Sequence, residues 1–141
     1  IFHHESQIFS HIERKRAKCT IGNENVVRLM QIDFTKFSIT TKKYGSRLRK
    51  KSIPESIFHS LMYNITQFFD CTNVYHCDVV PKNIAITPSK QYYIFDMDMA
   101  YIKSKKKNIK CIDNITAAYS NFKDYIIHAG NNGIRIRGKE R

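Results

Sequence analysis

The sequence of 141 residues has no apolar run long enough to cross a bilayer and no internal repeat, so neither a membrane-spanning nor a repeat protein is expected. No charged start followed by an apolar stretch and a small-residue cleavage site is present, and no secretory signal is expected. The four cysteines, Cys19, Cys71, Cys77 and Cys111, form no C-x-x-C pair. Because a chain of this size can bury its own core, we expect reduced thiols in an intracellular protein, not a disulfide scaffold.

Acidic residues are few. Twelve Asp and Glu stand against 24 Lys and Arg, which leaves a formal net charge of +12. Such a charge attracts polyanions, phosphate-bearing ligands or acidic protein surfaces at long range, but it identifies no function by itself. The N-x-T sequons at Asn64 and Asn114 are short enough to occur by chance, so glycosylation is not expected.

Two segments have the hydrophobic spacing of amphipathic helices. In residues 3–16, the apolar side chains fall on one face. A second helix is expected from Ile53 to about residue 70, because Ser52 and Glu55 have the spacing of a capping box and a broad apolar stripe follows them. The second helix is the expected centre of the core.

Pairs of short runs rich in β-branched residues predict two strand hairpins, 26–32 with 37–41 and 84–87 with 92–95. Helices and hairpins together predict the α+β class. The basic run from Lys103 to Lys110 is expected to be a solvated loop, residues 112–129 a further helix, and the Gly- and charge-rich tail a fraying end.

The candidate catalytic residues lie in two segments, HCDVVPKN (76–83) and FDMDMA (95–100). Asn83 follows Asp78 by five residues, and Asp96 follows Asn83 by thirteen, at the end of an expected strand. Phosphoryl transfer needs one carboxylate to orient the attacking hydroxyl and accept its proton, and oxygen ligands to hold Mg²⁺ against the nucleotide phosphates. The alternative for these residues is ordinary turn chemistry, which Asp and Asn favour.

HCDVVPKN resembles the catalytic loop H-R-D-x-x-P-x-N of the protein-kinase superfamily, and FDMDMA resembles the metal-binding D-F-G-L-A segment of that family. The strong match covers residues 76–100. The resemblance implies ATP and Mg²⁺ as cofactors, with Asp78 as the catalytic base and Asn83 and Asp96 as the Mg²⁺ ligands.

The order of the other elements fits the same resemblance. Glu5 lies where the family has the acid of its αC helix, which partners a nucleotide-binding Lys, and Lys82 is a further implied nucleotide contact. His76 is the implied buried anchor of the catalytic loop. The implied fold is a partial protein-kinase-like domain, with residues 1–44 as a remnant small lobe and 45–141 as a hinge, a partial large lobe and a basic tail.

Departures from the family pattern leave two functions open. Val80 stands where serine/threonine kinases usually have a Lys, and Asp98 replaces the Gly after the metal-binding Asp. No Gly-rich loop or V-A-I-K Lys precedes Glu5, and no A-P-E follows Asp96. The first function is an ATP-dependent kinase directed at Ser or Thr of a protein, and the alternative is an inactive kinase mimic that binds and regulates another kinase.

The expected partner is accordingly a protein substrate or a partner kinase. A nucleic-acid-binding domain ranks lower, because the sequence has no recognition helix or stacking motif, and no membrane partner is expected. The expected location is intracellular and cytoplasmic, within a host cell if the protein is viral.

Overall fold

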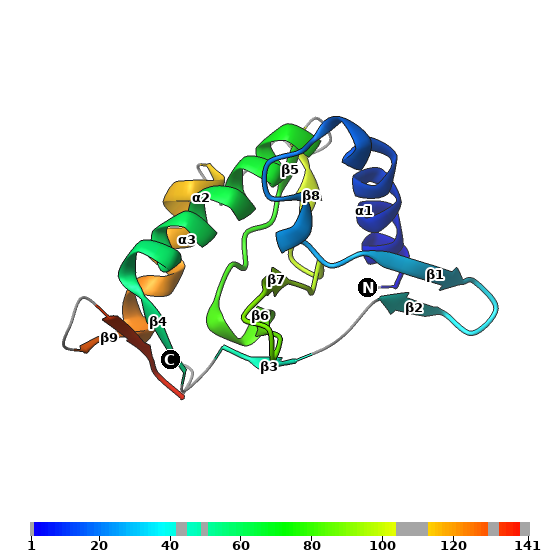
Figure 1. Cartoon of the computed structure of the whole chain (residues 1–141). Helices are drawn as coiled ribbons and strands as arrows, with labels where there is room; N and C mark the ends of the chain where they lie inside the picture. The colour runs from blue at the N-terminus through cyan, green and yellow to red at the C-terminus, as the bar shows by residue number, and fades with distance from the viewer. Residues whose placement is uncertain (1, 42–44, 49–50, 104–112, 130–132, 139–141) are drawn as a thin grey trace.

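The structure is a computed structural model that describes residues 2–41, 45–48, 51–103, 113–129 and 133–138 (Figure 1). Its helices are α1 (Phe2–Lys15), α2 (Glu55–Thr72) and α3 (Asn114–Phe122), and its 3-10 turns are η1 (Arg16–Lys18), η2 (Asn23–Asn25), η3 (Pro81–Asn83) and η5 (Lys123–Tyr125). Its strands are β1 (Leu29–Asp33), β2 (Ser38–Thr41), β3 (Ser46–Arg47), β4 (Ser52–Pro54), β5 (Val74–Tyr75), β6 (Ile84–Ile86), β7 (Tyr92–Ile94), β8 (Tyr101–Ile102), β9 (Ile126–Ala129) and β10 (Gly133–Ile136).

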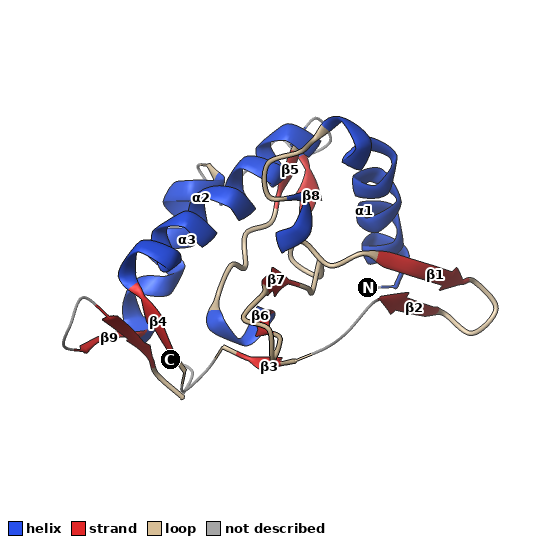
Figure 2. Cartoon of the chain, viewed as in Figure 1, coloured by secondary structure: helices blue, strands red, loops and turns tan. Residues whose placement is uncertain are grey.

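The strands form small antiparallel sheets that lie at separate places around the helices (Figure 2). β1 pairs with β2, and this hairpin projects from the body of the molecule beside α1. β6 lies between β3 and β7, β5 pairs with β8, and β10 lies between β4 and β9. The predicted α+β class and both predicted hairpins are confirmed. In the part of the chain that the structure describes, no helix is long and apolar enough to span a membrane.

Helix α2 is the centre of the hydrophobic core, as its apolar stripe predicts. Phe58, Ile65 and Phe69 on this helix are at most 1% exposed. Phe58 packs edge-on against Phe122 of α3, with the ring centroids 5.3 Å apart. Burying each of these side chains contributes about 1.5–3 kcal/mol to the free energy of folding. Helix α2 is therefore the main element of the hydrophobic core.

The predicted capping box is wrong. α2 begins at Glu55, and its N-cap residue Pro54 makes no side-chain capping bond. Ser52 instead belongs to β4, because its neighbour Ile53 is 1% exposed and pairs with Ile134 of β10. Burial of Ile53 in a sheet therefore outweighs the local capping preference of the Ser and Glu spacing.

The prediction of reduced thiols is also wrong. Cys19 and Cys71 form a disulfide with a Cα–Cα distance of 5.8 Å, which joins the segment after α1 to the last turn of α2. Cys77 is disulfide-bonded as well. Cys111 lies outside the described residues.

The C-terminal part of the chain is less helical than predicted. α3 ends at Phe122, and β9 and β10 follow it in place of a continued helix and a frayed end. Ile134 and Ile136 are 2% and 0% exposed and flank the exposed Arg135, which is the alternation of a half-buried strand. The basic run from residue 104 to 110 and part of the predicted hinge, residues 42–44, lie outside the described residues.

Arg16 fastens the end of α1 to the chain before β1. Its guanidinium is buried and donates to the carbonyl oxygens of Asn23 and Val27 at 2.9 and 3.0 Å, and it pairs with Glu13 at 2.9 Å. Burial lowers the pKa of Arg16, and the pairing with Glu13 opposes that shift. Val27 in turn donates to Ile94 of β7, so the first predicted strand starts later than expected, at Leu29. These bonds hold α1 against the sheet that carries the candidate site.

Candidate functional site

The polar side chains of residues 76–83 bond to one another. The Nδ2 of Asn83 donates to the backbone oxygen of Asp78 and to its Oδ2, both at 2.9 Å. The backbone N–H of Asp78 donates to Nδ1 of His76 at 3.1 Å. Asn83 is 2% exposed, so its bonds are protected from water. The loop therefore holds the Asp78 carboxylate in one place.

His76 connects this loop to Asp96 at the end of β7. Its Nε2 donates to the backbone oxygen of Asp96 at 2.7 Å, because Nδ1 is occupied as an acceptor. The backbone N–H of Phe95 donates to the carbonyl of Asn83 at 2.9 Å, a second link between the two segments. The predicted burial of His76 is confirmed at 0% exposure. This burial lowers the pKa of His76, so its imidazole is neutral at pH 7.

Asn114, which the sequence analysis missed, supports the same loop from α3. Its Oδ1 accepts a hydrogen bond from the backbone N–H of His76 at 3.1 Å. Its Nδ2 donates to the backbone oxygen of Val74 at 2.7 Å and to Oδ1 of Asp70 at 2.8 Å. The sequence signals a helix start at Asp113, whose carboxylate caps α3, but it carries no signal for these tertiary bonds.

A cleft of about 460 Å³ adjoins these residues, between α1, β2 and the end of β7. Ligand sites of this kind commonly have such volumes and combine apolar walls with a few polar groups. Glu5 and Asp96 supply carboxylates to this cleft, and most of its other walls are apolar. The described residues that line it are Phe2, Glu5, Phe9, Phe37, Ile39, Thr41, Phe95 and Asp96.

The structure brings only some of the predicted nucleotide contacts to this cleft. Glu5 and Asp96 line it directly. Asp78 and Asn83 are connected to Asp96 through His76 and Phe95 but are not among the described lining residues. Lys82 lies half-buried in η3 and is not among them either, so its nucleotide contact stays a prediction. Val80, at the position of the missing Lys, is buried in the core.

Two residues of the site have the left-handed backbone that L side chains rarely adopt. Cys77 has a φ of 67° and Asp96 a φ of 61°. At Asp96 the strain is eased locally, since the Oδ1 of its side chain accepts a hydrogen bond from the N–H of Asp98 at 3.0 Å. Strained backbone of this kind concentrates at functional sites, where the surrounding structure maintains it.

The surroundings of Glu5 disfavour the charged form of its carboxyl group. Burial raises the pKa of its carboxyl, and the negative charges of Asp96 and Asp98 raise it further. A hydrogen bond from the backbone N–H of Met97 acts in the opposite direction. Carboxylates gathered in this way favour a positively charged ligand or partner group between them.

Glu5→Gln is expected to raise the free energy of unfolding at pH 7 by less than about 1 kcal/mol, because water screens a half-buried group. Gln keeps an oxygen that can accept from the Met97 N–H and removes the charge. The pKa of Glu5 in the folded protein lies above its ordinary value of 4.5. The gain in the free energy of unfolding is therefore complete above the folded-state pKa and disappears below pH 4.5. Urea unfolding of both proteins at pH 4 and pH 7 measures this difference. Equal stability at pH 7 would contradict the assigned repulsion.

Hard cations select oxygen ligands, and the site supplies them. Mg²⁺ is usually bound by one or two carboxylates, with water and substrate phosphates completing its coordination. Asn83 uses its amide nitrogen for both bonds to Asp78, so its Oδ1 is the atom that can face a cation. Asp96 provides a carboxylate nearby on the same network. Among the described residues, no cluster of three or more His, Cys, Asp or Glu forms a metal site of protein ligands alone.

No protein-family model matches this chain, and no curated protein matches it. The resemblance to protein kinases therefore depends on the motifs in residues 76–100.

Proposed function

We propose that this protein is a kinase-like enzyme that transfers the γ-phosphoryl group of ATP to a hydroxyl of Ser or Thr in a protein. One observation carries the proposal. His76 joins the hydrogen-bonded pair of Asp78 and Asn83 to Asp96, which lines a cleft of nucleotide-ligand size. A chance set of turn-forming residues would not need this shared buried anchor.

In this proposal, each polar residue has a separate task. Asp78 orients the substrate hydroxyl and accepts its proton, while Asn83 holds the Asp78 carboxylate in position. The oxygens of Asn83 and Asp96 are the ligands that would hold Mg²⁺, which supplies neutralisation of phosphate charge when it is bound. The apolar walls of the cleft, among them Phe37 and Ile39, provide contacts for the nucleotide base.

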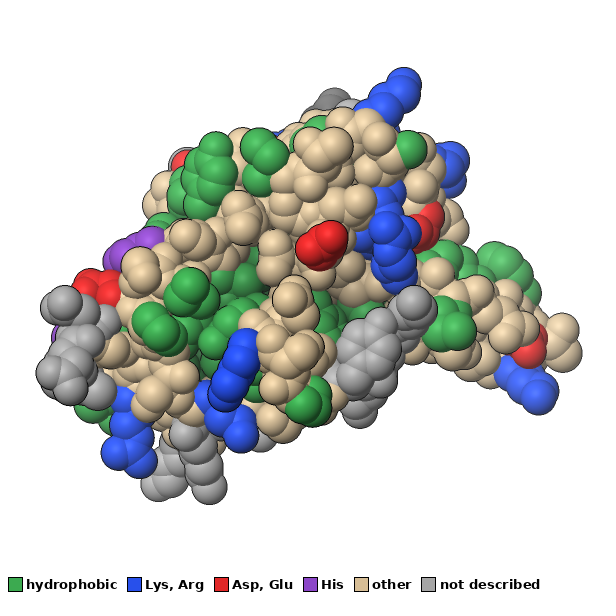
Figure 3. Space-filling model, viewed as in Figure 1, with side chains coloured by type: hydrophobic (Ala, Val, Ile, Leu, Met, Phe, Trp, Pro, Cys, Tyr) green, Lys and Arg blue, Asp and Glu red, His purple; other side chains and the backbone are tan. Residues whose placement is uncertain are grey.

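The second candidate, an inactive mimic that binds another kinase, is favoured by the composition of the cleft. Among the described residues that line it, none is a Lys or Arg that could contact the nucleotide phosphates. On the face shown in Figure 3, Lys and Arg side chains lie at separate places and form no continuous patch for a polyanion. A protein partner is preferred to nucleic acid for both functions because the sequence has no recognition helix or stacking motif.

The test is a thermal-shift titration with Mg-ATP. A ligand that binds only the folded state at 100 times its Kd stabilises it by about 2.7 kcal/mol, which corresponds to a rise in Tm of about 5–10 °C. We expect this rise for the wild type, with loss of the rise in EDTA and in Asp96→Asn. Asn is the appropriate replacement because it tolerates the left-handed backbone at this position.

Asp33→Asn provides a matched loss of charge. Asp33 caps the turn between β1 and β2 and is not among the described residues of the cleft. This variant should keep the full Mg-ATP shift. A shift that survives in Asp96→Asn would refute the assigned site. No shift in the wild type, together with capture of a kinase without ATP, would favour the inactive mimic.

A further inference from the structure

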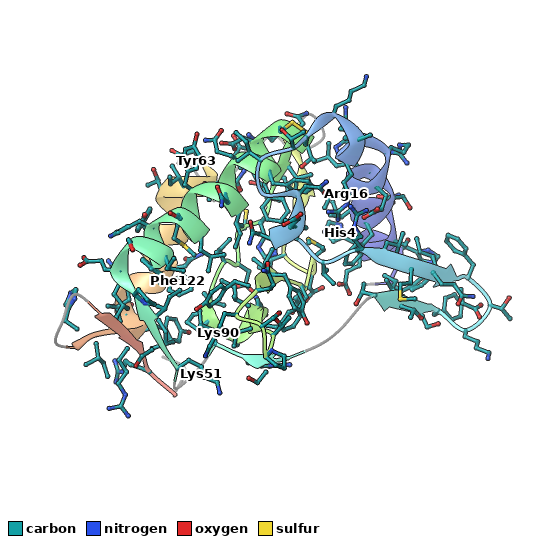
Figure 4. The ribbon with its side chains drawn as sticks, viewed as in Figure 1. His4, Arg16, Lys51, Tyr63, Lys90 and Phe122 are labelled. Carbon is teal, nitrogen blue, oxygen red and sulfur yellow. A yellow bond between two sulfur atoms is a disulfide. The ribbon has the colours of Figure 1, made fainter. Side chains whose placement is uncertain are left out.

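The two N-x-T sequons have opposite structural environments. Asn114 is 2% exposed, and all the polar atoms of its side chain are engaged. Asn64 lies on α2 and is half-buried, next to Tyr63, which is 49% exposed and lies on the outer side of the helix (Figure 4). The Asn64 side-chain amide makes no hydrogen bond to any other described residue. The sequons are therefore equivalent in sequence and not in structure.

From this contrast we propose that Asn64 carries an N-linked glycan and that Asn114 does not. In the transfer, a bond forms between the Asn64 Nδ2 and the anomeric carbon of an oligosaccharide. The bond from that carbon to the pyrophosphate of a polyisoprenoid-linked donor breaks, and the amide loses one proton. The lipid pyrophosphate is the leaving group, so the step needs no oxidant or reductant.

A glycan at Asn114 is incompatible with the fold. A substituted amide has one N–H, whereas Asn114 donates two hydrogen bonds, to Val74 and Asp70. The sugar would also have to occupy the buried contact between α3 and the catalytic loop. At Asn64 the substitution removes no hydrogen bond. The turn at Gly22 packs against the Asn64 backbone oxygen on one side, and the exposed side chains of Tyr63 and of Ser60, one turn earlier, leave the other side of Asn64 open to solvent.

The disulfides supply an independent argument for this modification. The Cys19–Cys71 bridge and the disulfide at Cys77 are typical of proteins that fold in an oxidising compartment, such as the lumen of the endoplasmic reticulum. N-linked transfer takes place in the same compartment, on chains that are still folding. The burial of Thr66, the third residue of the first sequon, therefore does not prevent transfer to Asn64.

The test uses the full chain, directed by an added signal sequence into the secretory pathway of a eukaryotic cell. The folded, oxidised protein is compared before and after treatment with a glycosidase that removes N-glycans. We expect treatment to increase the gel mobility by one step, as for the loss of a single glycan. Asn64→Gln should abolish that increase completely. Mass spectrometry of the released peptide should show Asn64 converted to Asp.

Thr116→Ala is the matched control. It destroys the second sequon and leaves Asn114 in place. It removes the exposed hydrogen bond from the Thr116 hydroxyl to Asp113 and keeps the capping bond from the backbone N–H of residue 116. This variant should show the same single step as the wild type. A folded protein without any glycan at Asn64 would overturn the proposal, as would a step that persists in Asn64→Gln or is lost in Thr116→Ala. None of these outcomes depends on kinase activity.

Discussion

Asp78→Asn is expected to lower the rate of phosphoryl transfer about 10²–10⁴-fold, the usual contribution of a positioned general base. The substitution changes one atom, and the new amide oxygen can still accept the hydrogen bond from Asn83. The backbone N–H of residue 78 still donates to His76, so the loop keeps its shape. Steady-state kinetics with labelled ATP and a protein rich in Ser and Thr measure kcat and KM for both proteins.

The binding of Mg-ATP separates this effect from a general loss of structure. Asp78 is not among the described residues of the cleft, so Asp78→Asn should keep the wild-type thermal shift while its kcat falls. Asp96→Asn should lose the shift itself, because it removes a charge from the cleft. Asp33→Asn should retain both. Turnover near the wild-type level in Asp78→Asn would show that this carboxylate is not the base.

Features encoded over a few neighbouring residues could be predicted from the sequence. The apolar spacing of the first helix predicts α1 within one residue at each end, since helix periodicity is local. The two hairpins are local for the same reason. The spacings of Asp78, Asn83 and Asp96 match the motifs of the family that they resemble, and the predicted hairpin between Asn83 and Asp96 returns the chain to the loop.

Features that depend on distant partners could not be predicted. Ile134 looks like part of a charged tail until β4 is known to lie beside it. Asn114 looks like an ordinary residue of a helix start, yet its side chain bonds three segments. Four cysteines without a C-x-x-C pair allow several pairings or none, and only the approach of α2 to the end of α1 selects Cys19 with Cys71.

Removal of the Cys19–Cys71 bridge is expected to lower the free energy of unfolding by about 4 kcal/mol, from the loop entropy of a separation of 52 residues. The double variant Cys19→Ala/Cys71→Ala leaves no unpaired thiol from this pair. The loss should appear as a lower urea midpoint without reductant, and m should be equal or larger, because the unfolded chain without the bridge is less compact. With dithiothreitol present, the wild type should fall to the stability of the variant under the same conditions.

The location of the bridge explains why its loss should also affect the site. α1 carries Glu5 to one side of the cleft, and α2 supports the other side, since Phe69 packs against His76 with ring centroids 5.1 Å apart. Joining the end of α1 to the last turn of α2 therefore limits how far the two sides can separate. We expect the double variant to bind Mg-ATP more weakly than the oxidised wild type at a temperature where both are folded. Equal urea midpoints without reductant would show that the bridge does not form in solution.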